Sequence, residues 1–149
     1  MSSDTDKETV RRAFKTLMEG DLGPLADLLA SDAVLHQCGF LDPIPAQAML
    51  ERDLSMRGRL QDREFRLERM VGEGDTVALH WRTSGRYADP DSPDRDGMQV
   101  SFPSMTFVRM AGGRIAEIWN IQDISTLQTQ LELAAQPPAG AGGGGDGQR

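Results

Sequence analysis

An acidic residue ends the apolar segment over residues 113–123, and it is the first candidate for acid–base chemistry. In a strand, alternate side chains point to the same face. The face predicted to point inward consists of Ile115, Glu117, Trp119, Ile121 and Asp123. A carboxyl group in such surroundings is partly desolvated, which raises its pKa and suits it to exchange protons near neutral pH. Asp is also a favoured N-cap, here of a helix beginning near residues 125–127, so both interpretations of Asp123 stay open.

The two histidines are the next candidates. His36 is predicted on a strand in phase with Val34 and Cys38, where it could donate to a substrate oxygen or orient a carboxylate. It could equally be an ordinary half-buried histidine at a strand end. His80 alternates with Trp81, so it lines a pocket only if the polar face of its strand is the concave one.

Aromatic and polar side chains could hold a flat hydrophobic substrate, although core packing explains them equally well. The predicted substrate-binding residues are Phe14, Trp81, Phe102, Thr106, Trp119 and Ile121. Weaker polar candidates are Gln37, Asn120 and Gln122. Cys38 has no evident base or cation beside it, which disfavours a nucleophilic role. The sequence contains no serine elbow, phosphate-cradling glycine loop or dinucleotide fingerprint.

Helical spacing dominates the part of the chain that must position these residues. Helices are predicted over residues 5–20, from residue 21 to about 29, and over 45–60. A capping box over residues 5–8 begins the first helix, and Gly20 ends it. A strand over 33–38 separates the second helix from the third.

Alternation of apolar and polar residues with a period of two dominates the remainder of the chain. Strands are predicted over residues 65–71, 77–83, 98–110 and 113–123, with a polar loop over 88–97. Pro103 interrupts the third of these strands, which favours a bulge or an edge position. The turn between the last two strands predicts that Thr106 lies opposite Trp119 and that Phe102 lies opposite Asp123.

Composition indicates one globular domain. The chain has 149 residues, of which 38% are hydrophobic, enough to bury a core. We expect the domain over residues 1–135 and a disordered Pro- and Gly-rich tail over 136–149. A net charge of −7 argues against nucleic-acid and membrane-surface partners.

The same counts predict a cytoplasmic protein without a structural metal. No apolar run is long enough to span a membrane, and the polar N-terminus has no signal-peptide pattern. The single cysteine fits a reducing compartment. One cysteine and two histidines argue against a structural zinc site.

The order of the elements predicts the fold class. Helices come first and antiparallel strands follow, which is typical of an α+β domain with helices packed on one face of the sheet. A strongly curved sheet with three N-terminal helices over its concave side would enclose a pocket, where ligands prefer to bind.

Three blocks of sequence resemble the SnoaL-like polyketide cyclases of the nuclear-transport-factor-2-like superfamily. Residues 20–36 are similar to the family's G-D-x-x-x-L…L-x-x-D-x-V-x-H opening. Residues 73–81 are similar to E-G-D-x-V-A-x-x-W. Residues 113–119 together with Asp123 match G-x-I-x-E-x-W-x-x-x-D. The resemblance covers about residues 5–133, nearly the whole chain except the tail.

The resemblance implies a cone-shaped α+β barrel, usually a homodimer, that acts without a cofactor on a hydrophobic polycarbonyl or aromatic small molecule. It implies that Asp123 is the general acid/base of an intramolecular aldol condensation and that His36 lies near the cavity. The chain departs from the family in the acidic loop over 88–97, at Pro103, and in the segment His36-Gln37-Cys38-Gly39-Phe40, where the family commonly has His-x-Pro.

The leading hypothesis is a polyketide cyclase of secondary-metabolite (antibiotic) biosynthesis. Asp123 would move the proton, and His36 and His80 would stabilise the enolate oxygen or orient the substrate. A hydroxylase, hydrolase or isomerase on the same fold is the second hypothesis, because a fold does not fix a function. A non-catalytic protein that binds a hydrophobic ligand is the third. An inward-pointing carboxylate argues against this third hypothesis, because burial of a charged group is unfavourable unless the group has a function.

Overall fold

The computed structural model describes residues 4–20, 22–37, 41–48, 51, 59–91 and 93–135. Its elements are α1 (Asp4–Glu19), α2 (Leu22–Leu28), β1 (Leu29–Gln37), β2 (Ile44–Pro45), β3 (Leu60–Glu73), β4 (Thr76–Tyr87), β5 (Met98–Ala111), β6 (Arg114–Gln122) and α4 (Ile124–Ala135). Cys38, most of the predicted helix over 45–60 and the predicted tail over 136–149 lie outside the described residues.

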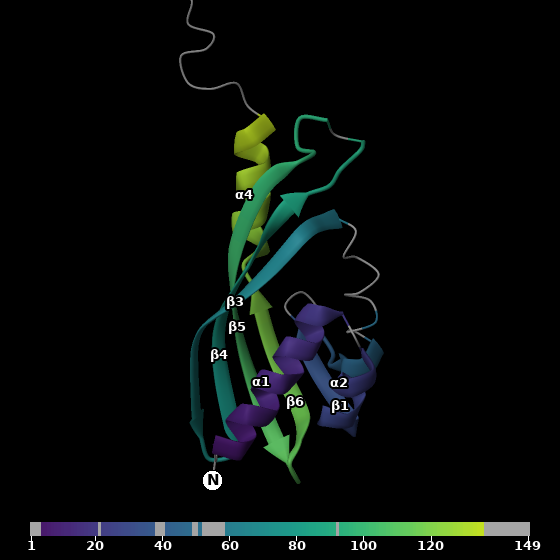
Figure 1. Ribbon diagram of the computed structural model, residues 1–149, viewed down its shortest axis with the longest axis vertical. Helices are drawn as coiled ribbons and strands as arrows, with labels where there is room; N and C mark the ends of the chain where they lie inside the picture. Colours follow the sequence, from purple (N-terminus) through teal and green to yellow (C-terminus); the bar gives the residue numbers. More distant parts are fainter. Residues whose placement is uncertain are drawn as a thin grey trace, which may run out of the picture.

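Six strands form one mixed sheet in the order β2-β1-β6-β5-β4-β3 (Figure 1). β1 runs parallel to β6, and the other neighbouring pairs are antiparallel. Within the described residues β2 and β3 do not pair with each other, so the sheet is not closed. The predicted α+β class is confirmed, with helices packed on one mixed sheet.

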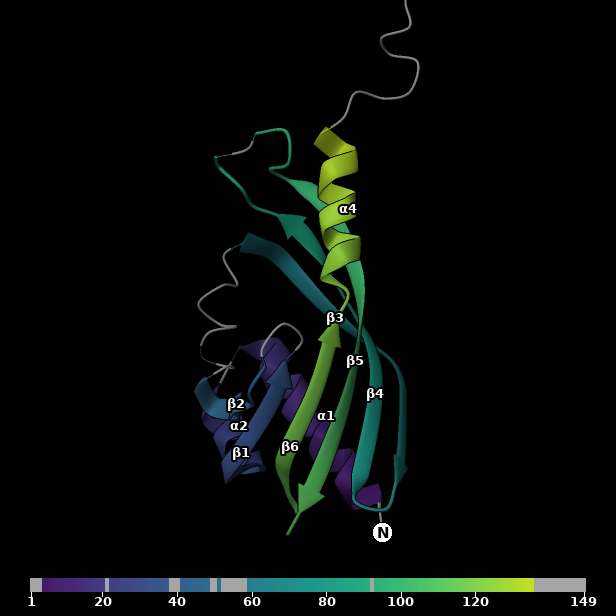
Figure 2. The same cartoon turned by 180° about the vertical axis from the view of Figure 1, so that it is seen from behind.

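Helix α1 packs across one face of the sheet, which we call the covered face (Figure 1). The opposite, open face is seen in Figure 2, where α1 lies behind the strands. The helix buries Val10 and Ala13, which are one turn apart. Phe14 packs edge-on against Trp81, with the ring centres 5.2 Å apart. The helix ends at Gly20, whose φ of 78° is a left-handed conformation that glycine adopts without strain.

Strand β4 shows why the sheet has two different faces. Val77, Leu79 and Trp81 are 0–5% exposed and belong to the core, whereas His80 between them is only half-buried. Since side chains alternate along a strand, the apolar set lies on the covered face and His80 lies on the open face.

Three strands are longer than the apolar alternation predicts. β3 and β4 extend beyond the predicted 65–71 and 77–83, because cross-strand hydrogen bonds continue through their polar ends. β1 begins at Leu29, which was expected at the end of the second helix, and pairs there with Ile115 of β6.

A β-bulge in the β5–β6 hairpin changes the predicted register. Met110 pairs with Ile115, but the preceding residue of β5, Arg109, pairs with Glu117. Ala116 is therefore an extra residue on β6, and every later pair is displaced by one residue.

The bulge makes the predicted pairing of Thr106 wrong and splits the predicted inward face. Thr106 pairs with Asn120, not with Trp119. Ile115 is buried on the covered face at 3% exposure. Glu117 and Trp119, which were expected to share its face, lie beyond the bulge and so point to the open face instead.

Pro103 lies inside β5 and causes no bulge, because the register with β4 is regular there. β6 ends at Gln122, so beyond that point one side of β5 has no partner strand. The carbonyl of Pro103 accepts a hydrogen bond from the backbone N–H of Asp123 at 3.0 Å. Asp123 therefore lies opposite Pro103, and the predicted pairing with Phe102 is wrong. Proline is tolerated because no ladder hydrogen bond needs its missing N–H.

Helix α4 covers the part of β5 that β6 leaves without a partner. The Gln130 side chain accepts a hydrogen bond from the Ser101 N–H at 3.1 Å and donates one to the Ser101 carbonyl at 2.8 Å. Leu131, the next residue, is buried. The amide of Gln130 thus takes the place of a strand backbone and protects an otherwise open edge.

Candidate functional site

A chain of hydrogen bonds crosses the covered face between four side chains. Trp81 Nε1–H donates to Thr106 Oγ1 at 2.8 Å, and the Thr106 hydroxyl donates to Asn120 Oδ1 at 2.8 Å. Asn120 Nδ2 then donates to Gln37 Oε1 at 3.1 Å. The four residues come from β4, β5, β6 and β1, so the sheet joins two predicted substrate-binding residues to two of the weaker polar candidates.

The direction of this chain is fixed by its first member. An indole N–H can only donate, so each following group accepts from its predecessor and donates to its successor. The chain ends at the Gln37 amide nitrogen, which has no acceptor within the described residues. Gln37 and Asn120 are half-buried rather than buried, so a ligand can reach this end. Fixed N–H donors of this kind stabilise an oxygen that becomes negative during a reaction.

Two buried hydroxyl groups lie on the same face. Thr83 and Ser104 are 0% and 2% exposed, and neither hydroxyl has a hydrogen-bond partner in the described part of the chain. Ser104 pairs directly with Trp81 across the strands. Neither residue was singled out in the sequence. The period-two spacing of Thr83 from Trp81 is the signal that places it on the covered face.

Asp123 is the N-cap of α4. Its Oδ1 accepts the Thr126 backbone N–H at 2.9 Å, and its Oδ2 accepts the Thr126 hydroxyl at 2.5 Å. The hydroxyl, followed by the backbone N–H, holds the pKa of Asp123 below its ordinary value, against a smaller opposing effect of burial. The raised pKa expected on an apolar face is therefore not found, because the start of α4 supplies two donors. A catalytic role for Asp123 stays a prediction.

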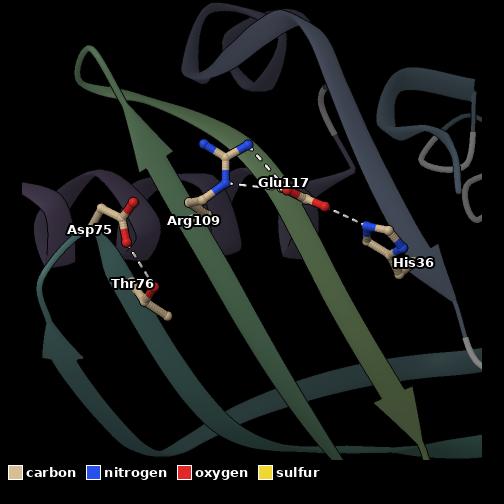
Figure 3. A network of polar contacts seen from close by, with 5 residues as sticks. All are labelled: His36, Asp75, Thr76, Arg109 and Glu117. Atoms are coloured by element: carbon tan, nitrogen blue, oxygen red, sulfur yellow. Dashed lines mark hydrogen bonds and ion pairs between the residues drawn. The ribbon is translucent and has the colours of Figure 1, made fainter.

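Glu117 joins β1 to β5 on the open face, with His36 and Arg109 on either side of it (Figure 3). Its Oε1 accepts hydrogen bonds from Arg109 Nε and Nη2 at 3.2 and 3.1 Å, and its Oε2 lies 2.6 Å from His36 Nε2. The His36 hydrogen bond, more than those from Arg109, lowers the pKa of Glu117, and burial opposes it. An ionised carboxylate can only accept, so His36 donates through Nε2. The His36 ring also stacks on Trp119 at 5.1 Å.

The structure divides the predicted site between two faces. On the covered face are Phe14, Trp81, Phe102 and Thr106, and on the open face are His36, His80, Trp119 and Ile121. Asp123 follows the end of β6. The two histidines are therefore not brought together with Trp81 and Thr106, and their predicted roles stay predictions.

The network around Glu117 was not foreseen. His36 and Glu117 are 81 positions apart, and they meet because β1 runs parallel to β6. A parallel pairing of distant strands leaves no local pattern in the sequence. Within the described residues, no three His, Cys, Asp or Glu side chains are grouped so as to hold a metal ion. None of the described helices is long and apolar enough to cross a membrane.

Comparison with known proteins identifies the family. The SnoaL-like domain matches residues 10–118, whereas no curated protein matches the chain. IdmH from Streptomyces antibioticus, provisionally named a polyketide cyclase, has a TM-score of 0.77 at 25% identity, over 85% of this chain and 98% of that one. AclR from Streptomyces galilaeus, provisionally named a hydroxylase, has a TM-score of 0.75 at 17% identity, over 92% and 87%. A protein from Jannaschia sp. CCS1, provisionally named a SnoaL-like polyketide cyclase, has a TM-score of 0.72 at 20% identity, over 91% and 94%. The chain belongs to the SnoaL-like domain family.

Proposed function

We propose that this protein is a cofactor-independent cyclase that closes a ring on a polyketide-like, hydrophobic polycarbonyl intermediate. The observation that carries the proposal is the directed chain of hydrogen bonds from Trp81 to Gln37 on the covered face. Aromatic side chains lie beside it, since Trp81 packs against Phe14 and Phe65 with ring centres 5.2 and 5.4 Å apart. Such surroundings suit a flat substrate with several carbonyl groups.

In the proposed reaction a base removes a proton from the carbon beside one carbonyl. The electron pair moves onto that carbonyl oxygen, which the amide N–H groups of Gln37 and Asn120 would stabilise. The enolate carbon then attacks a second carbonyl of the same molecule, a carbon–carbon bond forms, and the new alkoxide takes up the proton. No oxidant or reductant is needed, because the product is an isomer of the substrate and its net oxidation state is unchanged.

Asp123 is the proposed base, as the resemblance to the cyclases implies. Its carboxylate is ionised near neutral pH and can accept a proton. The Thr126 hydrogen bonds that lower its pKa also make it a weaker base than a free aspartate. The stabilising role first predicted for His36 and His80 passes in this proposal to Gln37 and Asn120, since both histidines lie on the open face.

The names of the similar structures support the chemistry at a coarse level. IdmH, at 25% identity, is provisionally named a polyketide cyclase. AclR, provisionally named a hydroxylase, shares the fold at 17% identity. Both chemistries therefore belong among the outcomes of the test.

The test is the incubation of the purified chain with a linear polycarbonyl chain and no added cofactor, followed by mass spectrometry. A product of unchanged mass, or one lighter by a water molecule, supports the cyclase. A product heavier by one oxygen with oxygen uptake indicates a hydroxylase, and unchanged substrate that co-purifies with the chain indicates a binding protein.

In the cyclase case, we expect Gln37→Met to lower kcat about tenfold or more with little change in KM. Gln47→Met is the matched control, because exposed Gln47 bonds only to Glu51 among the described residues.

The proposal includes a homodimer formed through the open face. Four large apolar side chains are exposed there by 38–63%: Met105, Phe107, Trp119 and Ile121. Exposed apolar patches of this kind mark interfaces. A two-fold axis would place the same patch on both subunits.

A further inference from the structure

A cavity lies beside β3, β4 and β5, which are neighbours in the sheet (Figure 1). Most of its lining residues are on the open face. Its volume is about 570 Å³, and three arginines and two serines are among the residues that line it. This volume is within the usual range of about 300–1,000 Å³ for small-molecule sites. None of the residues predicted to form the catalytic site lines it. A cluster of guanidinium groups is unexpected in a chain whose net charge is −7.

Arg66 and Arg82 lie directly opposite each other on β3 and β4, where like charges repel. Glu68 relieves this repulsion. Its Oε1 accepts hydrogen bonds from Arg66 Nε and Nη2 at 3.0 and 2.8 Å and lies 3.8 Å from Arg82 Nε. The register shift between Leu67 and Arg69 leaves Glu68 as the extra residue of β3, which lets it reach both arginines.

Glu68 leaves most of the guanidinium donors without an acceptor. A second carboxylate, Glu64, also lines the cavity, but it forms no ion pair with either arginine within the described residues. Each guanidinium carries five N–H groups. Arg82 makes one side-chain hydrogen bond within the described residues, from Nη1 to Ser101 Oγ at 3.3 Å. The side chains of Arg66 and Arg82 are 73% and 39% exposed, so their remaining donors can reach a ligand. Ser84 lines the same cavity and supplies a second hydroxyl group.

Arg63 and Phe65 also line the cavity. The Arg63 guanidinium lies over the Phe65 ring, 4.4 Å from its centre. That ring packs against Trp81 on the covered face, so Arg63 is not one of the donors on the open face.

We propose that this arginine groove, formed by Arg66, Arg82, Ser84 and Ser101, binds the phosphate or carboxylate group of a small organic molecule. A guanidinium matches either oxyanion with two parallel hydrogen bonds. The volume leaves room for an organic part beside the anion. The groove lies on the open face, so it is separate from the hydrogen-bond chain and does not depend on the cyclase proposal.

The test is isothermal titration of the full chain with phenyl phosphate, benzoate and uncharged benzamide at low salt. We expect saturable binding of at least one of the two anions and none of benzamide. Arg82→Gln and Arg66→Gln should each weaken binding about tenfold, through loss of charged hydrogen bonds. Glu68→Gln should strengthen binding, because the carboxylate that competes for both arginines is gone.

Arg86→Gln is the matched control. Arg86 is also on β4, but it pairs with Asp62 at 2.6 Å and does not line the groove. Stronger binding of phenyl phosphate would identify a phosphate ligand, and stronger binding of benzoate a carboxylate. Absence of saturable binding by both anions would overturn the proposal, as would equal weakening by Arg86→Gln or a Glu68→Gln variant that binds no better. Because Arg66 is exposed, its variant keeps the test valid even if Arg82→Gln folds poorly, which melting curves would reveal.

Discussion

The carboxylate of Asp123 and the first turn of α4 are joined through one residue, Thr126. Both oxygens of Asp123 accept from it, one from the backbone N–H at 2.9 Å and the other from the hydroxyl at 2.5 Å. Asp123 is therefore a helix cap whatever else it does. Capping and catalysis can be separated, because the first needs an acceptor oxygen and the second needs an ionisable group.

Asp123→Asn should keep the cap and lose the base. Asn is as good an N-cap as Asp, so the melting temperature should stay close to that of the wild type. Turnover should fall by about 10²–10⁴, the usual contribution of a general acid/base. Asp123→Ala is the control that removes both functions, and it should also melt several degrees lower. Unchanged turnover in Asp123→Asn would contradict a catalytic role.

Thr126→Val should shift the acid limb of the pH–rate profile. The Thr126 hydroxyl is the largest cause of the lowered pKa of Asp123, so its removal raises that pKa toward the ordinary value of about 3.9. If ionised Asp123 is the base, the fall in kcat/KM on acidification begins at a higher pH in the variant. Profiles of both proteins measured down to about pH 3 check this. An unmoved acid limb would assign the base to another group.

Phe107→Glu should abolish the proposed dimer. Phe107 is 53% exposed in the apolar patch and lies opposite Trp119, and a charge there would be buried in a two-fold interface without a partner. Sedimentation velocity should show a dimer for the wild type and a monomer for the variant. Leu133→Glu is a suitable control, because Leu133 is similarly exposed at 62% but lies on α4. A monomeric wild type at tens of micromolar would refute this part of the proposal.

His36→Gln should make the melting temperature depend less on pH in the acid range. The His36 hydrogen bond is the main cause of the lowered pKa of Glu117. Glu117 therefore stabilises the fold fully above its unfolded pKa of about 4.3 and loses this contribution as the pH falls through its lower folded pKa. Between about pH 5 and pH 3, the melting temperature of the wild type should fall further than that of the variant. His80→Gln, which leaves the Glu117 hydrogen bonds intact, should follow the wild type; equal slopes in all three proteins would contradict the prediction.

The family and the general arrangement could be predicted from the sequence. The change from helical to period-two spacing indicated the α+β class, and β4 shows why this worked. The alternation of Val77, Leu79 and Trp81 with Ala78 and His80 is a property of five consecutive positions, and burial of the large apolar set separates the two faces. The predicted start of the last helix also depended on a local signal, the acidic cap before Ser125.

The register of β6 could not be predicted in the same way. Ile115 is buried and Ile118 packs against the same core, but an odd spacing of three cannot place both on one face of a regular strand. The bulge at Ala116 resolves this conflict, and whether a strand bulges depends on its partner and on the core it must fill. One extra residue then turned Trp119 and Ile121 to the open face.

The sequence by itself thus determined the fold class, the separation of the β4 side chains into two sets and the two alternatives for Asp123, because each depends on neighbouring residues. Only the tertiary structure decided which distant groups meet. The parallel pairing of β1 with β6 brings Gln37 to Asn120 and His36 to Glu117. The direction of the hydrogen-bond chain likewise depends on Trp81 reaching Thr106 from another strand. Contacts of this kind follow from strand order and register, which the packing of the whole core selects rather than any local pattern.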